Sequence, residues 1–339
     1  MKTRLLKVDP DDPCPQALEE AATILREGGL VAFATETVYG LGAIATNPSA
    51  VERIFEAKGR PAGNPLIVHL EETGQARPYV ADWPESAACL ASQFWPGPLT
   101  MVLRRSSLIP PIVSGGRETV ALRVPVTMVA RKLIAAVGQP LAAPSANTSN
   151  RISPTCAAHV LADLGGRIEL ILDSGPTSIG LESTVLDLTT YPPRILRPGP
   201  IGPAEIERGL GQGDQVEFIR HDSSSVNDPV SPGMLPRHYA PLTRAVRVES
   251  ALELANLAWP ERAGVVVFAT PELPELPTSA ERVDLEEPET ASRFLYSTLH
   301  RLDERGLELI VVVMPPDLPQ WRTIRDRLIR ATESLDSGH

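Results

Sequence analysis

The chain has 339 residues, of which 42% are hydrophobic, and its formal net charge is -10. This length supports a sizeable core and indicates two or three domains. The negative charge argues against a protein whose main task is to grip nucleic acid, because that affinity comes largely from neutralising phosphates.

Other classes of protein are also disfavoured. No apolar run approaches the ~18 residues of a membrane span, and the N-terminal MKTRLLKVDPDD turns acidic before any signal-peptide apolar region develops. Cys14, Cys89 and Cys156 are far apart and form no C-x-x-C pair, so we expect free thiols in a reducing compartment. We therefore predict a cytoplasmic protein without membrane contact.

The first predicted elements alternate between helix and strand. A helix opened by Pro15 precedes an apolar strand over 30–34 and a Gly-rich turn. Ser49 is predicted to cap a second helix, which ends at Gly59 before a strand over 66–70. Further short strands are predicted at 99–104, 119–124, 140–143, 168–172 and 184–188, with helices near 85–94, 127–137, 155–164 and 203–210. This order predicts one mixed α/β domain over residues 1–219.

The alternation of predicted helices and strands stops over 220–243, where Ser and Pro are frequent and apolar residues show no regular spacing. We interpret this segment as an interdomain linker. A smaller α/β domain is predicted over 244–339, from strands at 264–269 and 308–314 and helices at 289–305 and 319–331.

Familiar catalytic motifs are missing from the sequence. It contains no G-x-x-x-x-G-K-S/T phosphate loop, no H-E-x-x-H, no G-x-S-x-G, and no G-x-G-x-x-G after a strand. The histidines lack neighbours at metal-ligand spacing, so we predict no protein-bound metal or prosthetic group.

Polar clusters remain where strands or helices end, which is where α/β domains collect ligands. The segment 35–42, TETVYGLG, combines hydroxyls with glycines that let a ligand approach the backbone. Lys58 and Arg60 place two cations at a helix exit, a combination suited to polyphosphate. An ordinary strand-to-turn junction and a solvated helix end explain the same two patterns equally well.

Three later clusters leave similar alternatives open. Arg123 lies in an alternating strand, and the pattern alone favours an outward-facing charge. The turn 143–150 leads to Ser153, predicted to cap a helix whose N-terminus offers N–H groups to an anion, or else to serve structure only. Ser183 and Arg197 again lie at strand ends, where a surface salt bridge would explain the arginine.

Taken together and in this order, the clusters resemble the threonylcarbamoyl-AMP synthase family, the YrdC-like enzymes, in the longer form with a C-terminal domain. The resemblance is strong over 15–241 and weaker beyond. It rests on TETVYGLG (35–42), KGRP with NPLIVH (58–69), ALRVP (121–125), APSAN with SPT (143–155), ESTV (182–185), RPG (197–199) and SPGMLPRHYAP (231–241).

This resemblance implies a mixed twisted-sheet YrdC-like domain followed by a small Rossmann-like domain. It also implies a nucleotidyltransferase that condenses L-threonine, bicarbonate and ATP into threonylcarbamoyl-AMP and pyrophosphate, with Mg²⁺ bound to the triphosphate. The product supplies N6-threonylcarbamoyladenosine at position 37 of tRNA. The implied partners are the proteins of the tRNA threonylcarbamoyltransferase complex, with a weak contact to tRNA as a further expectation.

The family's site residues carry over one by one. The implied threonine pocket comprises Thr37, His69, Arg123, Ala143 and Ser183. The implied ATP contacts are Lys58, Arg60, Asn64, Thr119, Ser145, Ser153, Arg197 and Tyr239. Lys58 and Arg60 are the predicted catalytic residues, beside the triphosphate. Tyr239 lies in the linker, so we hypothesise that the linker also acts as a lid that excludes water from a hydrolysable adenylate.

The sequence departs from the family pattern at two places. Asn150 stands where glycine is common, and the last helix reads TIRDRLIRA where an Ala-Ile-Asn-Asp-Arg-Leu type of sequence is usual. The first departure affects the turn near Ser153, and the second leaves the role of the C-terminal domain open.

Three other functions stay open from the sequence. An RNA-binding module would use Lys58, Arg60, Arg117, Arg123 and Arg197, although aromatic residues make up only 4% of the chain. A carbamoyl-adenylate enzyme of hydrogenase maturation would carry acylphosphatase and Cys-rich zinc modules, which the sequence lacks. A nucleotide sensor on the same fold would bind ATP without releasing pyrophosphate.

Overall fold

The computed structural model describes residues 2–211, 215–218, 238–269 and 272–335. Contacts divide the chain into two compact units. Unit 1 comprises 1–149, 154–178 and 182–235, and unit 2 comprises 150–153, 179–181 and 236–339. In the linker predicted over 220–243, residues 220–237 lie outside the described part of the chain, and 238–243 belong to unit 2.

Unit 1 is built on an 11-stranded mixed sheet. Its strands, in spatial order, are β1 (Arg4–Lys7), β8 (Leu170–Asp173), β2 (Val31–Ala34), β3 (Tyr39–Ile44), β7 (Leu141–Ala142), β4 (Ile67–His69), β6 (Thr119–Arg123), β5 (Leu99–Arg104), β9 (Thr184–Asp187), β10 (Arg194–Arg197) and β11 (Glu217–Phe218). Parallel and antiparallel pairs alternate irregularly along the sheet, as in β4–β6 and β5–β6. The predicted mixed sheet is therefore confirmed.

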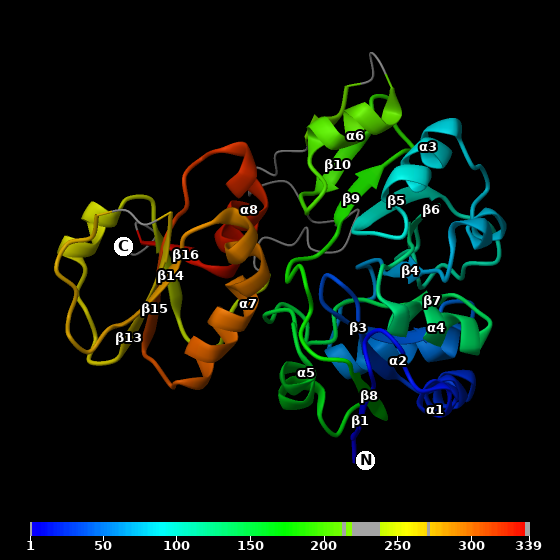
Figure 1. Cartoon of the computed structure of the whole chain (residues 1–339), viewed down its shortest axis with the longest axis horizontal. Coiled ribbons are helices and arrows are strands. Elements are labelled where there is room, and N and C mark those ends of the chain that lie inside the picture. Colours follow the sequence, from blue (N-terminus) through cyan, green and yellow to red (C-terminus); the bar gives the residue numbers. More distant parts are fainter. Residues whose placement is uncertain (1, 212–214, 219–237, 270–271, 336–339) are drawn as a thin grey trace. The chain divides into compact units, whose positions relative to one another are not determined.

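Helices cover both faces of this sheet. They are α1 (Pro15–Arg26), α2 (Pro48–Lys58), α3 (Glu85–Phe94), α4 (Met128–Val137), α5 (Ala157–Leu164) and α6 (Pro203–Leu210), with short 3-10 turns η1 (Thr73–Gln75) and η2 (Arg77–Tyr79). Strand β2 shows how one sequence serves two cores, because successive side chains point to opposite faces. Val31 and Phe33 pack with α1 and α4, which contact each other (Figure 1), while Ala32 and Ala34 belong to the core that includes α2 and α5.

Two predicted helix caps are wrong. Asn47, not Ser49, caps α2, since its side chain accepts bonds from the backbone N–H groups of Ser49 and Ala50. Helix α5 starts after Cys156, which is its N-cap, so Ser153 does not cap it. The Gly-rich turn predicted at 35–42 is also shorter than expected, because its second half is the buried strand β3.

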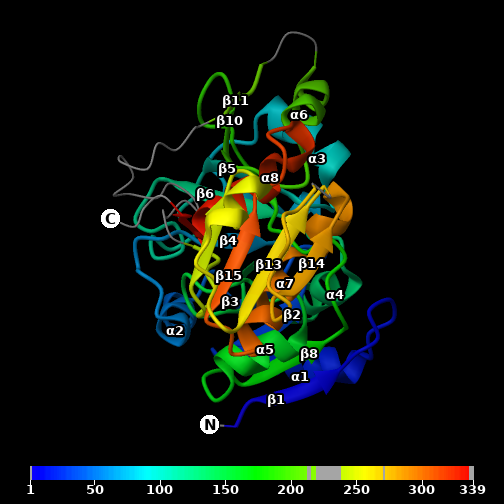
Figure 2. The same ribbon diagram turned by 90° about the vertical axis from the view of Figure 1, so that its left-hand side faces the viewer.

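Unit 2 contains a five-stranded parallel sheet in the order β14-β13-β15-β12-β16, and Figure 2 shows β13 between β14 and β15. The strands are β12 (Ala245–Val248), β13 (Ala263–Phe268), β14 (Glu281–Leu285), β15 (Leu309–Val313) and β16 (Glu333–Ser334). The helical segments are η3 (Ala251–Asn256), α7 (Pro288–Glu304), η4 (Pro319–Trp321) and α8 (Arg322–Ala331). The parallel strands, nearly all apolar in β13 and β15, confirm the predicted Rossmann-like class.

Asn150 has a φ of 69°, in the left-handed region that glycine adopts most easily. Asparagine is among the few other residues that tolerate this conformation. The turn at Asn150 thus has the left-handed backbone conformation that glycine would adopt there, although the residue is asparagine. Within the described residues, no helix is both long and apolar enough to span a bilayer.

Candidate active site

Arg123, the last residue of β6, is buried in unit 1, with only 3% of its surface exposed. Its guanidinium donates to the Glu36 carboxylate at 2.6 Å, to the Thr37 hydroxyl at 2.9 Å and to the Gly97 carbonyl at 3.2 Å. The outward-facing charge favoured by strand alternation is therefore wrong. The polar partners offset the desolvation that would otherwise exclude an arginine from the interior.

Glu36 holds Arg123 in place, a role that the sequence analysis missed. Its second carboxylate oxygen accepts the Val126 N–H at 3.1 Å. The turn that carries Glu36 is closed by Thr35, whose hydroxyl donates to the Val38 carbonyl and lies 2.8 Å from the Thr37 hydroxyl. The TETV segment therefore builds a polar turn around the guanidinium.

His69 lies beside Arg123, because β4 and β6 are parallel and these two residues are register partners. Burial, and after it the positive charge of Arg123, lowers the pKa of His69 to about 3. The imidazole is therefore neutral at neutral pH. Ala143 joins this region through its N–H, which donates to the Ile67 carbonyl at 2.9 Å.

Ser183 precedes β9 and is bonded from two sides. Its hydroxyl lies 2.8 Å from the buried Thr100 hydroxyl. Arg197, the last residue of β10, donates to the Ser183 carbonyl at 2.9 Å and to its hydroxyl at 3.1 Å. Arg197 is buried, so a surface salt bridge does not explain it. Thr100 is a second supporting residue that the sequence analysis missed.

Lys58 ends α2 and is 1% exposed, so the alternative of a solvated helix end is wrong. Its ammonium donates to the Ser145 carbonyl at 2.5 Å and also to the Asn147 carbonyl. Burial, and after it the charge of Arg60, lowers the pKa of Lys58 well below its ordinary value. The lysine thus joins the end of a helix to the 145–147 turn.

Arg60 and Asn64 form the next loop. The guanidinium of Arg60 donates to the carbonyls of Asn64 at 3.2 Å and Pro65 at 2.9 Å. The Asn64 side chain is buried, yet neither its amide nitrogen nor its amide oxygen has a hydrogen-bond partner among the described residues. Such a group is costly in a folded protein unless a ligand or an ordered water satisfies it.

Thr119 and Ser145 lie close to these loops. Thr119 opens β6, whose Ala121 is the register partner of Ile67 in β4, shortly after the Asn64 loop. Ser145 forms an isolated antiparallel bridge with Gly40. Unit 1 therefore brings together eleven of the predicted residues through bonds or neighbouring strands.

The other two predicted residues, Ser153 and Tyr239, belong to unit 2. The Ser153 carbonyl lies 3.2 Å from the His300 Nε2 atom. Tyr239 is buried among side chains of α7 and α8.

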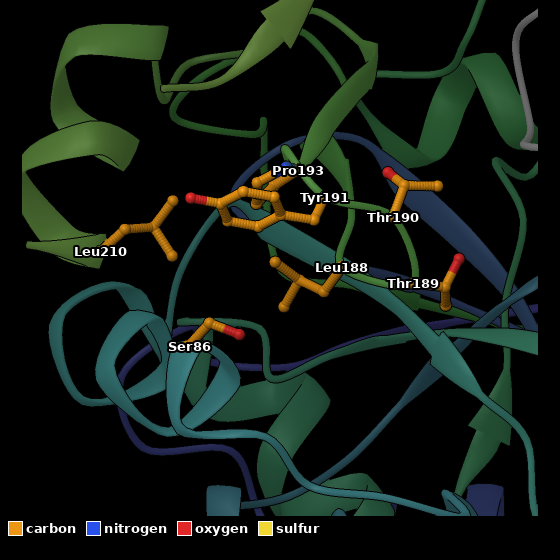
Figure 3. Close-up of a pocket in the computed structure, with 7 residues that line it drawn as sticks. All are labelled: Ser86, Leu188, Thr189, Thr190, Tyr191, Pro193 and Leu210. Atoms are coloured by element: carbon orange, nitrogen blue, oxygen red, sulfur yellow. The ribbon is translucent and has the colours of Figure 1, made fainter. Parts of the chain in front are cut away.

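A separate pocket of about 300 Å³ lies elsewhere in unit 1. Figure 3 shows its lining residues, which come from α3, α6 and the connection after β9 and include no predicted site residue: Ser86, Leu188, Thr189, Thr190, Tyr191, Pro193 and Leu210. The described residues also contain no group of three His, Cys, Asp or Glu side chains placed to hold a metal ion.

The mixed sheet defines an α/β domain, with buried cations at the ends of its strands and helices. Residues 23–199 match the Sua5/YciO/YrdC family model, described as "Telomere recombination", and 201–332 match the model for the "Threonylcarbamoyl-AMP synthase, C-terminal domain". The chain belongs to the threonylcarbamoyl-AMP synthase family, a family of nucleotidyltransferase-type enzymes, as its motifs predict.

Relatives and a solved structure agree with this membership. The chain is 43% identical to a threonylcarbamoyl-AMP synthase of Pyrococcus abyssi, covering 92% of this chain and 93% of the relative. It is 41% identical to that of Bacillus subtilis, covering 98% of each. The crystal structure of P. abyssi Sua5 complexed with L-threonine matches with a TM-score of 0.85 and 38% identity, covering 98% of this chain and 99% of the other.

Proposed function

We propose that this chain forms threonylcarbamoyl-AMP and pyrophosphate from L-threonine, bicarbonate and ATP, using the residues gathered in unit 1. The supporting observation is the buried guanidinium of Arg123, bonded to Thr37 and Glu36, in a chain similar to a protein solved with L-threonine. A buried guanidinium with a hydroxyl beside it and two N–H groups unused among the described residues suits a small zwitterion that carries its own carboxylate.

Arg123 is the proposed anchor for the threonine carboxylate. Its bonds to described residues use three of the five guanidinium N–H groups. The other two are left to donate to a carboxylate. The hydroxyls of Thr37 and Ser183, the neutral imidazole of His69 and the backbone at Ala143 then recognise the amine and side chain of threonine.

The ATP end is proposed to use the buried cations and amide of the neighbouring loops. Lys58 and Arg60 lie beside the triphosphate, and the Asn64 amide gains in ATP the partner it lacks among the described residues. The remaining proposed ATP contacts are Thr119, Ser145, Ser153, Arg197 and Tyr239. Because the described residues form no carboxylate or histidine cluster for a metal, Mg²⁺ is proposed to arrive with the triphosphate, whose charge it neutralises when bound.

The chemistry requires positioning more than a side-chain nucleophile. Bicarbonate takes up a proton and loses water to give CO2, and the threonine amine adds to the CO2, losing a proton and giving a carbamate. A carbamate oxygen then attacks the α-phosphorus of ATP. The bond between the α-phosphorus and the oxygen that bridges to the β-phosphate breaks, and pyrophosphate leaves. Lys58 and Arg60 stabilise the negative charge that develops on the leaving group.

The product is an activated group, and the proposed acceptor is adenosine 37 of tRNA, through the proteins of a threonylcarbamoyltransferase complex. An RNA-binding module is less well supported, because four of its five predicted cations are each 8% exposed or less, namely Lys58, Arg60, Arg123 and Arg197, and only Arg117 is half-buried. Cations buried in this way cannot run along an RNA backbone in the manner that such binding requires.

Pyrophosphate release from ATP tests the proposal, with threonine and bicarbonate omitted in turn. Release should depend on both. ATP binding without pyrophosphate release would instead favour a nucleotide sensor, and salt-sensitive tRNA binding without turnover would favour an RNA-binding module.

A further inference from the structure

Arg327, in the middle of α8, is the largest fully buried side chain of the described residues and has no exposed surface. Arginine is almost never fully buried unless it is paired. The mechanism proposed for unit 1 makes no use of this residue, so its surroundings in unit 2 are informative.

The guanidinium of Arg327 lies over the ring of Tyr239, with its central carbon 5.1 Å from the ring centroid. One of its nitrogens donates to the Asp326 carboxylate at 2.6 Å. The same carboxylate accepts bonds from Arg330 at 3.1 and 3.3 Å. The Asp326 carboxylate thus pairs with the positive charges of both buried arginines. Arg327 in addition contacts the tyrosine through a cation–π interaction.

Two further contacts hold the same tyrosine. The ring of Tyr296 in α7 stacks on that of Tyr239, with centroids 5.7 Å apart and planes inclined by 28°. The backbone N–H of His238 donates to the Arg330 carbonyl at 3.0 Å. Both the ring of Tyr239 and the chain just before it are therefore fixed to α7 and α8.

The backbone of Tyr239 has a conformation that needs stabilising contacts. Its φ is 62°, in the left-handed region, which costs a residue other than glycine roughly 1–2 kcal/mol. Such a conformation persists only where the surroundings determine it. We propose that Arg327, supported by Asp326 and Arg330, is a positioning residue that fixes Tyr239 in the conformation with which it contacts ATP. This inference rests on the proposed ATP contact of Tyr239.

Steady-state pyrophosphate release by Arg327→Lys tests the inference in the full chain. Lysine keeps the charge but lacks the planar group that stacks on the ring. KM for ATP should rise about tenfold, because the lysine ammonium has neither the reach nor the planar donor geometry to hold both the ring and Asp326, while KM for threonine stays unchanged. Arg325→Lys is the matched control. Arg325 lies on the same helix and bonds to Glu249 and the Pro315 carbonyl, so its KM for ATP should not change.

A double-mutant cycle separates positioning from general support of unit 2. In a Tyr239→Leu background, Arg327→Lys should have no further effect on KM for ATP. An undiminished effect there, or an unchanged KM in the single variant, overturns the inference. If Arg327→Lys does not fold, Asp326→Asn replaces it, with the same expected rise and the same cycle. Wild-type chain that releases no pyrophosphate would overturn the proposed function instead.

Discussion

Arg123 in unit 1 and Arg327 in unit 2 are both buried arginines, but their surroundings differ. The partners of Arg123 are a carboxylate, a hydroxyl and a carbonyl, and two of its N–H groups stay unused among the described residues. Arg327 instead covers an aromatic ring of its own chain. Burial alone therefore does not mark a substrate site. The unused N–H donors of Arg123 indicate a site for a ligand. The position of Arg327 over the Tyr239 ring indicates that this arginine holds the ring in place.

The largest expected effect tests Arg123 as a ligand anchor. Arg123→Gln should lower kcat/KM for threonine at least 100-fold, because a charged bidentate contact to the carboxylate is lost and Glu36 is left as an unpaired buried charge. Pyrophosphate release at varied threonine concentration measures the effect.

The double variant Glu36→Gln/Arg123→Gln provides the control. It removes the unpaired charge, so part of the stability lost in Arg123→Gln should return while threonine use stays impaired. Recovery of threonine use in the double variant would show that Arg123 serves structure only.

His69 gives the next largest effect, on stability. Its pKa is about 3 in the folded chain, against an ordinary value of 6.5, so the unfolded chain binds the extra proton between these two pH values. Stability contributed by the neutral imidazole should therefore fall as pH drops below 6.5, by about 2 kcal/mol at pH 5. Urea unfolding across this range measures it. His69→Gln should flatten this part of the profile, and a profile identical to wild type would contradict the assignment.

Asn64 distinguishes a ligand contact from a structural one. Asn64→Leu should raise the free energy of unfolding by about 1 kcal/mol, because an unpartnered buried amide is removed, and should raise KM for ATP about tenfold. Asn47→Ala is the matched control. It should cost about 1 kcal/mol through the lost helix cap and leave KM for ATP unchanged. A destabilised Asn64→Leu variant with normal KM would place Asn64 with the structural residues.

The smallest effect concerns Asn150 in unit 2. Asn150→Gly should change stability by only a few tenths of a kcal/mol, because the easier left-handed φ is offset by a more flexible unfolded chain. Thermal unfolding measures this change. A loss above about 1 kcal/mol would mean that the asparagine side chain stabilises the turn in a way its φ does not explain.

Local patterns predicted most of the fold. Apolar runs located β2, β5 and β15, and proline and glycine bounded α1 and α2. The strands that escaped prediction, such as β1 and β14, are short and have charged residues at half or more of their positions, so their sequences carry little apolar signal. The place of β1 in its sheet depends on pairing with β8, which lies far along the chain.

The site shows a similar limit. The family motifs named Arg123, but strand alternation directed it outward, since its partner Glu36 lies 87 residues away. Thr100 and Ser183 are 83 residues apart and meet only because β5 and β9 pair in parallel. A chain-local pattern contains no information about such pairs.

The hydrogen bonds from Lys58 to the 145–147 turn have a consequence for the order of folding. Its ammonium is buried against carbonyls that follow it by 87 and 89 residues, and its own carbonyl accepts the Ser149 N–H at 2.8 Å. During synthesis, therefore, α2 emerges long before the oxygens that satisfy this cation. The buried contacts of Lys58 at the end of α2 can form only after the APSAN segment (143–147) has been synthesised. This segment therefore completes the packing of unit 1 at a late stage of folding.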